Sequence, residues 1–540
     1  MADDALPDYV RALLEPDAYP HAPDEIELRQ THISYVFLSG DVVYKTKKPV
    51  DFGFIQQLDA ETRERFCSAE VALNRRLAPD VYIDVVPIMR TSDGRFVVEG
   101  DIEGAGEIVE HAVKMRRLPD DRTLDQLLAA NAAPEDVIEQ IADRVVALHA
   151  GAEVVANDPS YAGVAAERAW WEREYDEAKG FISGTWHAED AAALEEFVTQ
   201  TIDAQAAIFD ERLAAGRVVE GHGDLQAKHV YVLPTETGTG AEQITIVDCV
   251  EFNDWFHFRY LDVGYDVAFL AMDLEALGRP DLGDEFAGRY IAATGDETIG
   301  VLQPLHRAFR AYVRGKVESI GAGAPEVPPS QQAELAASAA RYFRLAAEYA
   351  ERRSGPALVI LAGLSGTGKT LVGATLAGRI GAAHVSSDVI RHELAEAAGL
   401  STAMWQKYEA GAYSAEMSQR TYSEMRKRAA AHLAAGRPVI LDAMHGRALD
   451  RAAAAHVARE AGVPTVIAEL RLSDDDAFAR LAQRERKANN TEVDQLAYQR
   501  HVESYEMVNA GEAQTHLALD ASQPPAEIAL EIAESLPPAN

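Results

Sequence analysis

The segment of this chain that most clearly predicts chemistry is a glycine-rich loop ending in a lysine and a hydroxyl. Residues 363–370 read Gly-Leu-Ser-Gly-Thr-Gly-Lys-Thr, which fits the pattern G-x-x-x-x-G-K-[ST] at every fixed position. Glycines let the backbone turn tightly with its N–H groups pointing inward, where they can cradle a polyphosphate. The alternative is a turn that binds nothing, and the lysine, the hydroxyl and the flanking segments together argue against it.

We therefore predict an ATP site with Mg²⁺ at this loop. The lysine would reach the β and γ phosphates and act in catalysis, and the last threonine would ligate the metal. The predicted nucleotide-binding residues are Gly363, Leu364, Ser365, Gly366, Thr367, Gly368, Lys369 and Thr370.

Short apolar strands that alternate with helices must position this loop. The strand candidates are 357–362, 383–387, 438–441, 465–472 and 516–519. Such alternation favours an open, doubly wound parallel sheet with helices on both faces, and so an α/β domain over residues 356–540.

Charged residues follow several of these strands. Asp388 and Arg391 stand three apart at a helix start, which suits a carboxylate that accepts a hydroxyl proton and an arginine that steadies the transferred group. Asp442 ends an apolar strand and is a candidate Mg²⁺ ligand. Arg480 and Arg484 share a helix face that could close over the phosphates. The alternatives are an N-cap aspartate with an ordinary ion pair, and a solvated basic helix.

Residues 356–520 resemble the P-loop kinase group, which includes polynucleotide 5′-hydroxyl kinases, zeta-toxin-like kinases and gluconate or chloramphenicol kinases. In this resemblance Asp388 and Arg391 match the acceptor-site pair of the first of these. A polynucleotide acceptor would need a basic channel or stacking aromatic residues, and no Lys/Arg run with interleaved aromatics is evident. A small hydroxylated molecule is therefore the preferred acceptor, with a polynucleotide 5′-hydroxyl as the alternative.

A second constellation lies in the first half of the chain. His222 stands two residues before Asp224, and Asp248 closes an apolar strand about two dozen residues later. Phosphoryl transfer uses this arrangement for its base and its metal ligand. Taken singly, each residue fits an ordinary turn or a solvated ion pair equally well.

These motifs resemble the aminoglycoside phosphotransferase-like enzymes, relatives of protein kinases, over most of residues 30–275. The resemblance implies a bilobal, protein-kinase-like α+β fold in which Asp224 is the catalytic base and Asp248 binds Mg²⁺. It also implies that Lys45 and Glu70 form the phosphate-binding lysine pair and that residues 113–116, with Met115, form the adenine-binding hinge. Asp262 and Asp266 match an acidic element that supports the catalytic loop.

The chain departs from that family at one metal position. Where the family has an asparagine for Mg²⁺, this sequence has His229, whose imidazole is a poor ligand for a hard, oxygen-seeking ion. We keep His229 with Asp248 as a candidate metal ligand. The alternative for this half is a regulatory pseudokinase that senses nucleotide. Lys47 and Lys48 also lie near the expected strand end, although Lys45 fits the strand pattern best.

Composition limits the remaining possibilities. The chain has 540 residues, 51 Lys and Arg against 87 Asp and Glu, and a net charge of −36, which disfavours long nucleic acid and anionic membrane surfaces. The 2 cysteines rule out a disulfide framework. No signal-like or membrane-spanning stretch is evident, so the expected location is the cytoplasm.

The clearest boundary is the Gly-, Ala- and Pro-rich stretch 321–330, which cannot continue a helix. We predict two domains: a kinase-like domain over residues 1–330 and a P-loop domain over 356–540, joined by a helix within 331–355. The predicted function is a bifunctional, ATP-dependent phosphotransferase with two hydroxyl acceptors.

Overall fold

The computed structural model describes residues 6–53, 55–99, 106–155, 157–158, 162–235, 242–252, 258–324, 327–352, 354–399, 414–487, 495–509 and 511–538, with the backbone alone for 484–487 and 495–497. Its internal contacts divide the chain into two compact units. The first unit contains residues 1–140, 147–161 and 215–266, and the second contains 141–146, 162–214 and 267–540.

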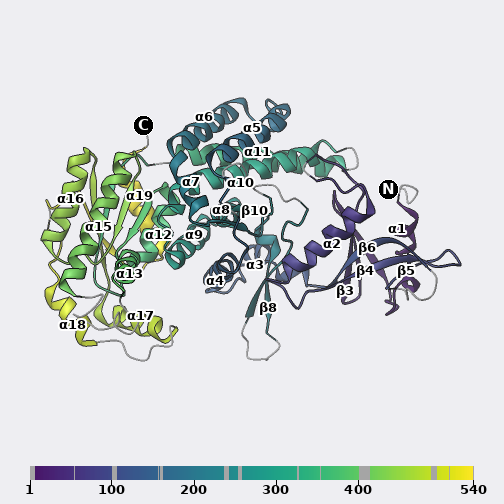
Figure 1. The fold of residues 1–540 in the computed structure, drawn as a ribbon, viewed down its shortest axis with the longest axis horizontal. Coiled ribbons are helices and arrows are strands. Elements are labelled where there is room, and N and C mark those ends of the chain that lie inside the picture. The colour runs from purple at the N-terminus through teal and green to yellow at the C-terminus, as the bar shows by residue number, and fades with distance from the viewer. Residues whose placement is uncertain are drawn as a thin grey trace. The chain divides into compact units, whose positions relative to one another are not determined.

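A six-stranded antiparallel sheet with the order β1-β2-β3-β6-β4-β5 builds the first unit (Figure 1). Its strands are β1 (Ile26–Gln30), β2 (Ser34–Ser39), β3 (Val42–Lys47), β4 (Tyr82–Arg90), β5 (Phe96–Val98) and β6 (Glu107–Arg116). Helix α2 (Ala60–Asn74) packs on β4 and β6. Strand β3 carries Lys45 and helix α2 carries Glu70, the two residues of the implied lysine pair.

The rest of the first unit carries the second half of the kinase-like motifs. Strand β7 (Val218–Glu220) pairs with β10 (Tyr260–Asp262), and β8 (Val230–Pro234) pairs with β9 (Glu242–Ile246), both antiparallel. β8 and β9 form a hairpin, whereas β7 and β10 form a separate two-stranded sheet; the loop 221–229 connects β7 to β8, and residues 247–252 follow β9. The antiparallel sheet with its packed helix agrees with the α+β class that the resemblance implied for this half.

A five-stranded parallel sheet with the order β12-β13-β11-β14-β15 lies in the second unit. The strands are β11 (Leu358–Ala362), β12 (Ala383–Ser386), β13 (Val439–Asp442), β14 (Thr465–Arg471) and β15 (Thr515–Asp520). One apolar core joins the sheet to α12 (Lys369–Ile380) and α19 (Pro525–Glu534), and another joins it to α13 (Ser387–Ala397), α15 (Ala415–Ala434) and α16 (Ala448–Ala461). The predicted doubly wound sheet is confirmed strand by strand.

The second unit also contains helices that precede the glycine-rich loop in the sequence. These are α5 (Val164–Ala178), α6 (Ala188–Ala204), α7 (Ala206–Ala214), α9 (Pro280–Thr294), α10 (Ile299–Ala322) and α11 (Pro329–Glu351). Phe343 of α11 stacks on Trp186 with ring centroids 4.7 Å apart, which fixes the predicted connecting helix against this bundle. The remaining helices are α1 (Asp8–Ala12), α3 (Leu124–Ala129), α4 (Val137–Ala150), α8 (Val263–Ala276), α17 (Asp474–Lys487) and α18 (Gln495–Ser504).

The bundle packs tightly on the helix that follows the glycine-rich loop. A Cβ placed on Gly288 of α9 would lie only 2.2 Å from Oγ1 of Thr375 on α12, so the two helix backbones approach closely there. The division by internal contacts thus puts residues 267–330 in the same unit as the P-loop segment, whereas the division predicted from the sequence assigned them to the kinase-like domain. The division at 330 and 356 remains a proposal about catalytic modules.

Within the residues that the structure describes, no helix is long and apolar enough to cross a lipid bilayer.

Candidate functional site

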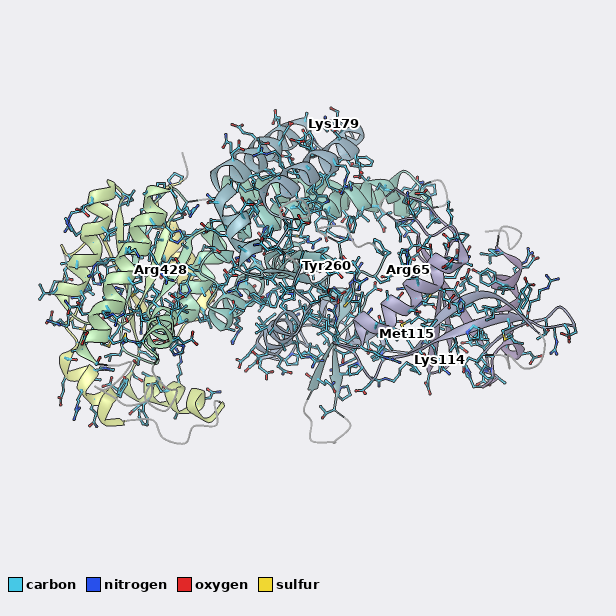
Figure 2. The ribbon with its side chains drawn as sticks, viewed as in Figure 1. Arg65, Lys114, Met115, Lys179, Tyr260 and Arg428 are labelled. Atoms are coloured by element: carbon cyan, nitrogen blue, oxygen red, sulfur yellow. The ribbon has the colours of Figure 1, made fainter. Side chains whose placement is uncertain are left out.

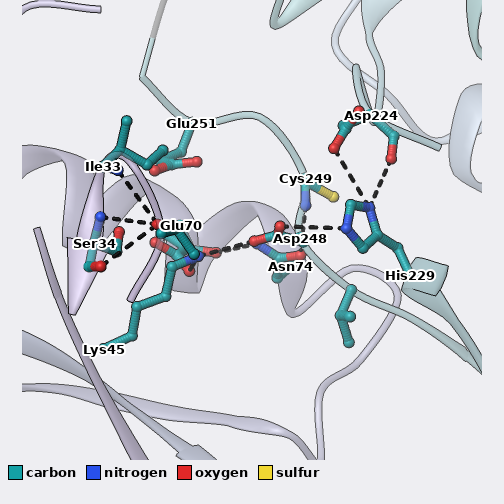
Figure 3. A network of polar contacts seen from close by, with 12 residues as sticks. Ile33, Ser34, Lys45, Glu70, Asn74, Asp224, His229, Asp248, Cys249 and Glu251 are labelled. Carbon is teal, nitrogen blue, oxygen red and sulfur yellow. Dashed lines mark hydrogen bonds and ion pairs between the residues drawn. The ribbon is translucent and has the colours of Figure 1, made fainter. Parts of the chain in front are cut away.

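The first candidate site gathers around Glu70 on α2, whose side chain is fully buried (Figure 3). Lys45 on β3 donates hydrogen bonds to Oε1 of Glu70 and to Oδ1 of Asp248, both at 2.9 Å. Strand β3 carries Lys45 and helix α2 carries Glu70, and the loop after β9 brings Asp248 to both of them. The structure therefore unites three predicted site residues that lie up to 203 positions apart in the sequence.

A second lysine, Lys47, shares the same carboxylate. Its Nζ donates to Oε2 of Glu70 at 2.7 Å and also pairs with Glu251, and the side chain of Lys47 is buried. Lys45 and Lys47 are two residues apart on a strand, so they lie on the same face of the sheet. The strand pattern could have indicated this double pairing, but the role of Glu251 has no signal in the sequence.

The charges of this cluster depend on one another. Burial alone would lower the pKa of Lys45, but Asp248, Glu70 and Glu251 raise it well above its usual value. Burial would raise the pKa of Asp248, whereas Lys45 and His229 lower it far below its usual range. The lysine is therefore held as a cation and Asp248 as an anion, the states needed to bind phosphate and metal.

Asp266 fixes the backbone of the loop 221–224 through hydrogen bonds. The Asp266 carboxylate is buried and accepts hydrogen bonds from the main-chain N–H of His222 at 2.6 Å and of Gly223 at 2.9 Å. His149 lies 3.1 Å from the same carboxylate. These hydrogen bonds agree with the resemblance, which implied that Asp266 supports the catalytic loop.

Asp224 and Asp248 face each other across His229. The Nδ1–H of His229 donates to the main-chain carbonyl of Asp224 at 2.9 Å, and Nε2 lies 3.6 Å from Oδ2 of Asp248. Ligand atoms of Asp224, His229 and Asp248 all lie within 4.8 Å of one another. The predicted base and both predicted metal ligands are therefore brought together, with 42% of the Asp248 side chain exposed.

Met115 lies close to the carboxyl end of β6, beside Lys114 (Figure 2). It is half-buried and packs in the apolar cluster that includes Val71, Tyr82 and, at the rim, Val247. The neighbouring Asp248 donates its main-chain N–H to the Tyr82 hydroxyl at 3.2 Å. The predicted hinge residue is therefore joined by packing to the loop that carries Asp248.

The second candidate site is the loop between β11 and α12. Gly366 and Gly368 have φ angles of +85° and +88°, which side-chain-bearing residues rarely adopt. A Cβ on Gly366 would also lie 2.4 Å from the carbonyl oxygen of Ala477, so the position admits only glycine. Lys369 folds across the loop and donates to the carbonyl of Leu364 at 2.7 Å. The loop has the form of a phosphate cradle with its lysine inside.

Asp442 ends β13, the strand next to β11, and its side chain is buried. Burial would raise the pKa of this carboxylate, but His384, Lys369 and a hydrogen bond from Thr370 lower it overall. The structure therefore joins Lys369, Thr370 and Asp442 as predicted. Sequence reasoning missed His384 on β12, whose Nε2 lies 3.5 Å from Oδ2 of Asp442.

His445 and Tyr422 lie just beyond Asp442. His445 is buried with a φ of +42°, and its Nδ1–H donates to the carbonyl of Leu361 at 2.7 Å. Burial lowers the pKa of His445 to about 4, so this imidazole is neutral at physiological pH. Its ring meets Tyr422 edge to face at 5.3 Å. No motif indicated either residue.

The predicted acceptor pair occupies two different environments on α13. Asp388 is exposed in the first turn of the helix. Arg391 is buried and its Nη1 donates to the Ser418 hydroxyl on α15 at 3.3 Å. The two residues are on one helix as predicted, and Arg391 is also tied to its neighbouring helix.

Helix α17 lies over the glycine-rich loop. Nη1 of Arg480 would be 3.6 Å from a Cβ on Gly368, and Leu481 packs close to Gly366. Arg480 also lines an open cavity of about 410 Å³ beside α17. Arg484, the predicted nucleotide ligand, has its backbone in α17, but its side chain lies outside the described residues.

This loop, the strand order and the terminal aspartate define a P-loop nucleotide-binding domain. In agreement, residues 358–508 match the AAA_33 family, described as an AAA domain. The chain as a whole belongs to the same family as the uncharacterized protein Rv2004c of Mycobacterium tuberculosis strain H37Rv. The two are 31% identical over 460 residues, which cover 85% of this chain and 86% of the relative. An uncharacterized protein of Mycobacterium bovis matches equally well.

Two solved structures resemble parts of the chain. A gluconokinase from Sinorhizobium meliloti is 19% identical, covers 34% of this chain and 97% of its own, and has a TM-score of 0.26. A choline/ethanolamine kinase family protein from Mesorhizobium loti is 12% identical, covers 64% of this chain and 98% of its own, and has a TM-score of 0.35.

Proposed function

We propose that this protein is a phosphotransferase that moves the γ-phosphate of ATP to hydroxyl groups of small molecules, at two separate sites. The observation that carries the proposal is geometric: the loop after β11 holds Lys369 folded across it, and Asp442 ends β13, the parallel strand paired with β11. A phosphate loop with its lysine, hydroxyl and acidic partner in register has little other use than binding a nucleoside triphosphate with a metal.

At the second-unit site the loop amides and Lys369 would hold the β and γ phosphates. Thr370 and Asp442 offer oxygen atoms, the ligands that Mg²⁺ prefers, so these residues fit that ion. Bound Mg²⁺ would neutralise charge that develops on the transferred phosphoryl group. Arg480, positioned over Gly368, would stabilise the same charge from the side of α17.

Asp388 is our proposed base for the acceptor hydroxyl at this site, with Arg391 as a positioning residue. Asp388 is exposed at the carboxyl edge of β12, where a small acceptor can reach it. The carboxyl ends of parallel strands meet at one edge of the sheet, so this edge also carries the phosphate loop. The acid would accept the hydroxyl proton as the oxygen attacks the γ-phosphorus.

At the first-unit site Lys45, held by Glu70, would bind the α and β phosphates, and Met115 would contact the adenine. Asp224 would accept the proton of the second acceptor. Two carboxylates and one imidazole fit a divalent cation, with Asp248 and His229 as ligands. A bound divalent ion would neutralise the phosphates, while Lys45 and Asp224 orient the two reactants.

One observation favours a second candidate function for the first unit. His229 stands at the sequence position where the family that this half resembles has an asparagine, and its Nε2 lies 3.6 Å from Oδ2 of Asp248. A site whose metal position is altered could bind nucleotide without transferring phosphate, which would make this unit a regulatory nucleotide sensor.

The test is a screen with γ-labelled ATP and a metabolite extract, using the wild type, Lys369→Ala and Asp224→Ala. Lys369→Ala should lose most ATP turnover, by roughly 100-fold or more, and Asp224→Ala should remove a distinct set of labelled products. An unchanged product profile in Asp224→Ala would favour the sensor function. Labelling of 5′-hydroxyl oligonucleotides above that of small molecules would overturn the proposed acceptor class.

We also place the protein in the cytoplasm. Cys67 and Cys249 are both free and buried, which fits a reducing compartment.

A further inference from the structure

A cavity of about 230 Å³ lies in the second unit, away from the glycine-rich loop. Its walls come from α8, α9, α10, α11, α19 and the last turn of α12. Three arginines line it together with two largely buried acids, Glu275 and Asp284, and the exposed Glu534. No residue assigned to phosphoryl transfer above takes part in it.

The buried acids of this cavity already have cationic or hydroxyl partners. Glu275 accepts a hydrogen bond from the Tyr349 hydroxyl at 2.6 Å and pairs with Arg352. Asp284 accepts from Nη1 of Arg307 at 2.8 Å and pairs with Arg379. The carboxylates are thus neutralised within the wall, and they leave little demand for a cation.

Arg307 has unused donors. Its side chain is only 4% exposed, and burial would lower its pKa, but Asp284, Tyr349 and Glu275 keep it charged. Within the described ranges its Nε and Nη2 have no hydrogen-bond partner. Buried N–H groups of a charged side chain are costly to leave unpaired, so a partner outside the protein is expected.

The two unused nitrogens form one edge of the guanidinium group. Nε–H and Nη2–H are parallel, the arrangement that binds two oxygens of a carboxylate or phosphate at once. We propose that this cavity is a binding site for a small oxyanion, the phosphate or carboxylate group of a metabolite, held by the free edge of Arg307. A single water would satisfy only part of this edge.

This site is distinct from the proposed nucleotide site and does not depend on the proposed reaction. Arg379 lies near the end of α12 opposite Lys369, and ten residues of helix separate the two by about 15 Å. Phosphate that binds the loop would therefore leave the cavity free, and the two sites can be tested separately.

The first test is calorimetric titration of the full-length Lys369→Ala protein with inorganic phosphate and with malonate, at constant ionic strength. Arg307→Lys keeps a cation for Asp284 but lacks the two-nitrogen edge, so it should weaken binding of the preferred anion at least tenfold. Arg352→Lys, a change at a half-exposed arginine of the same cavity, is the matched control and should weaken it less than threefold. Phosphate binding identifies a phosphate source, and malonate binding identifies a carboxylate source.

Equal affinity in Arg307→Lys and its parent, or binding of neither anion at millimolar concentration, would overturn the proposal. A second measurement needs no substitution in the cavity. Hydrogen exchange of the unsubstituted protein, saturated with ADP, should slow at residues 303–307 and 378–380 when phosphate is added. Protection confined to residues 363–370 would count against the site.

Discussion

Nε2 of His229 lies 3.6 Å from Oδ2 of Asp248, while the opposite ring nitrogen of His229 donates to the main chain of Asp224. When an imidazole is neutral and its Nδ1–H donates to a carbonyl, Nε2 carries the lone pair, and a metal ion can bind there. The imidazole therefore presents an acceptor nitrogen to the space between the two carboxylates. A softer divalent ion would suit this donor set better than Mg²⁺ does.

The metal preference of the first unit should follow this imidazole. We expect Mn²⁺ to bind at least tenfold more tightly than Mg²⁺, and His229→Asn to reduce the difference to about threefold because an amide oxygen suits the harder ion. Electron paramagnetic resonance of Mn²⁺, with Mg²⁺ as competitor in the Lys369→Ala background, measures both affinities. An unaltered ratio in His229→Asn would exclude His229 as a ligand.

Substitution of Lys47 should mainly lower stability, whereas substitution of Lys45 should mainly abolish nucleotide binding. Lys47→Met leaves Glu70 and Glu251 buried without one shared cation, so the free energy of unfolding should fall by about 3 kcal/mol or more. Lys45→Met should cost less stability, because Lys47 still pairs with Glu70, but should abolish nucleotide binding to the first unit. Urea denaturation and nucleotide titration of both variants check this. Equal losses of stability would contradict the assignment.

Acid should destabilise the second unit through His445. Its pKa falls from 6.5 to about 4 on burial, so the unfolded chain takes up the proton more readily than the folded one. The stabilisation is complete above pH 6.5 and is lost as the pH falls toward 4, by about 3 kcal/mol in total.

The matched variant for this pH effect is His445→Asn. Asparagine tolerates the positive φ and can donate to Leu361. Thermal unfolding midpoints between pH 7 and 4 should fall less steeply in this variant than in the wild type. Parallel curves for the two proteins would show that His445 does not titrate in this range.

His384 should matter for the metal at Asp442 although it touches no phosphate. Nε2 of His384 is buried, has no hydrogen-bond partner within the described residues and lies 3.5 Å from Oδ2 of Asp442, so a small shift would let it donate to this carboxylate. Loss of a residue that supports a metal ligand costs about 10- to 100-fold in metal affinity. We expect His384→Leu to raise the Mg²⁺ concentration needed for half-maximal ATP turnover, with partial recovery in His384→Gln. An unchanged Mg²⁺ requirement would assign His384 to packing alone.

The P-loop half of the molecule could be predicted in detail because its determinants are local. An apolar run, a glycine pattern and a helix follow one another directly at 358–380, and the observed strand β11 differs from the predicted 357–362 by one residue. The strand that carries Asp442 could be placed for the same reason. His384 escaped notice because its role depends on which strand neighbours β13, and the sheet order is not written in any local pattern.

The kinase-like half was predictable through its motif order rather than through its contacts. Lys45 and Glu70 meet as expected, and the strand pattern could have added Lys47, yet nothing in the sequence indicates that Glu251 would complete the cluster. Arg307 and its cavity were also missed, because a buried arginine in a helix has the same local sequence as an exposed one. Such residues can be recognised only in the folded structure, where segments that are distant in the sequence come together.

The close approach of Gly288 to Thr375 has a practical consequence for anyone dissecting this protein. A fragment cut at residue 356 would retain the whole glycine-rich loop and Asp442 but strip α9 and α10 from the outer side of α12, leaving a helix surface of small apolar residues in water. We expect such a fragment to precipitate on expression, whereas the full-length chain, which keeps these helices and the bundle behind them, should stay in solution. A transfer of this P-loop domain between genes during evolution would therefore have had to include α9 and α10.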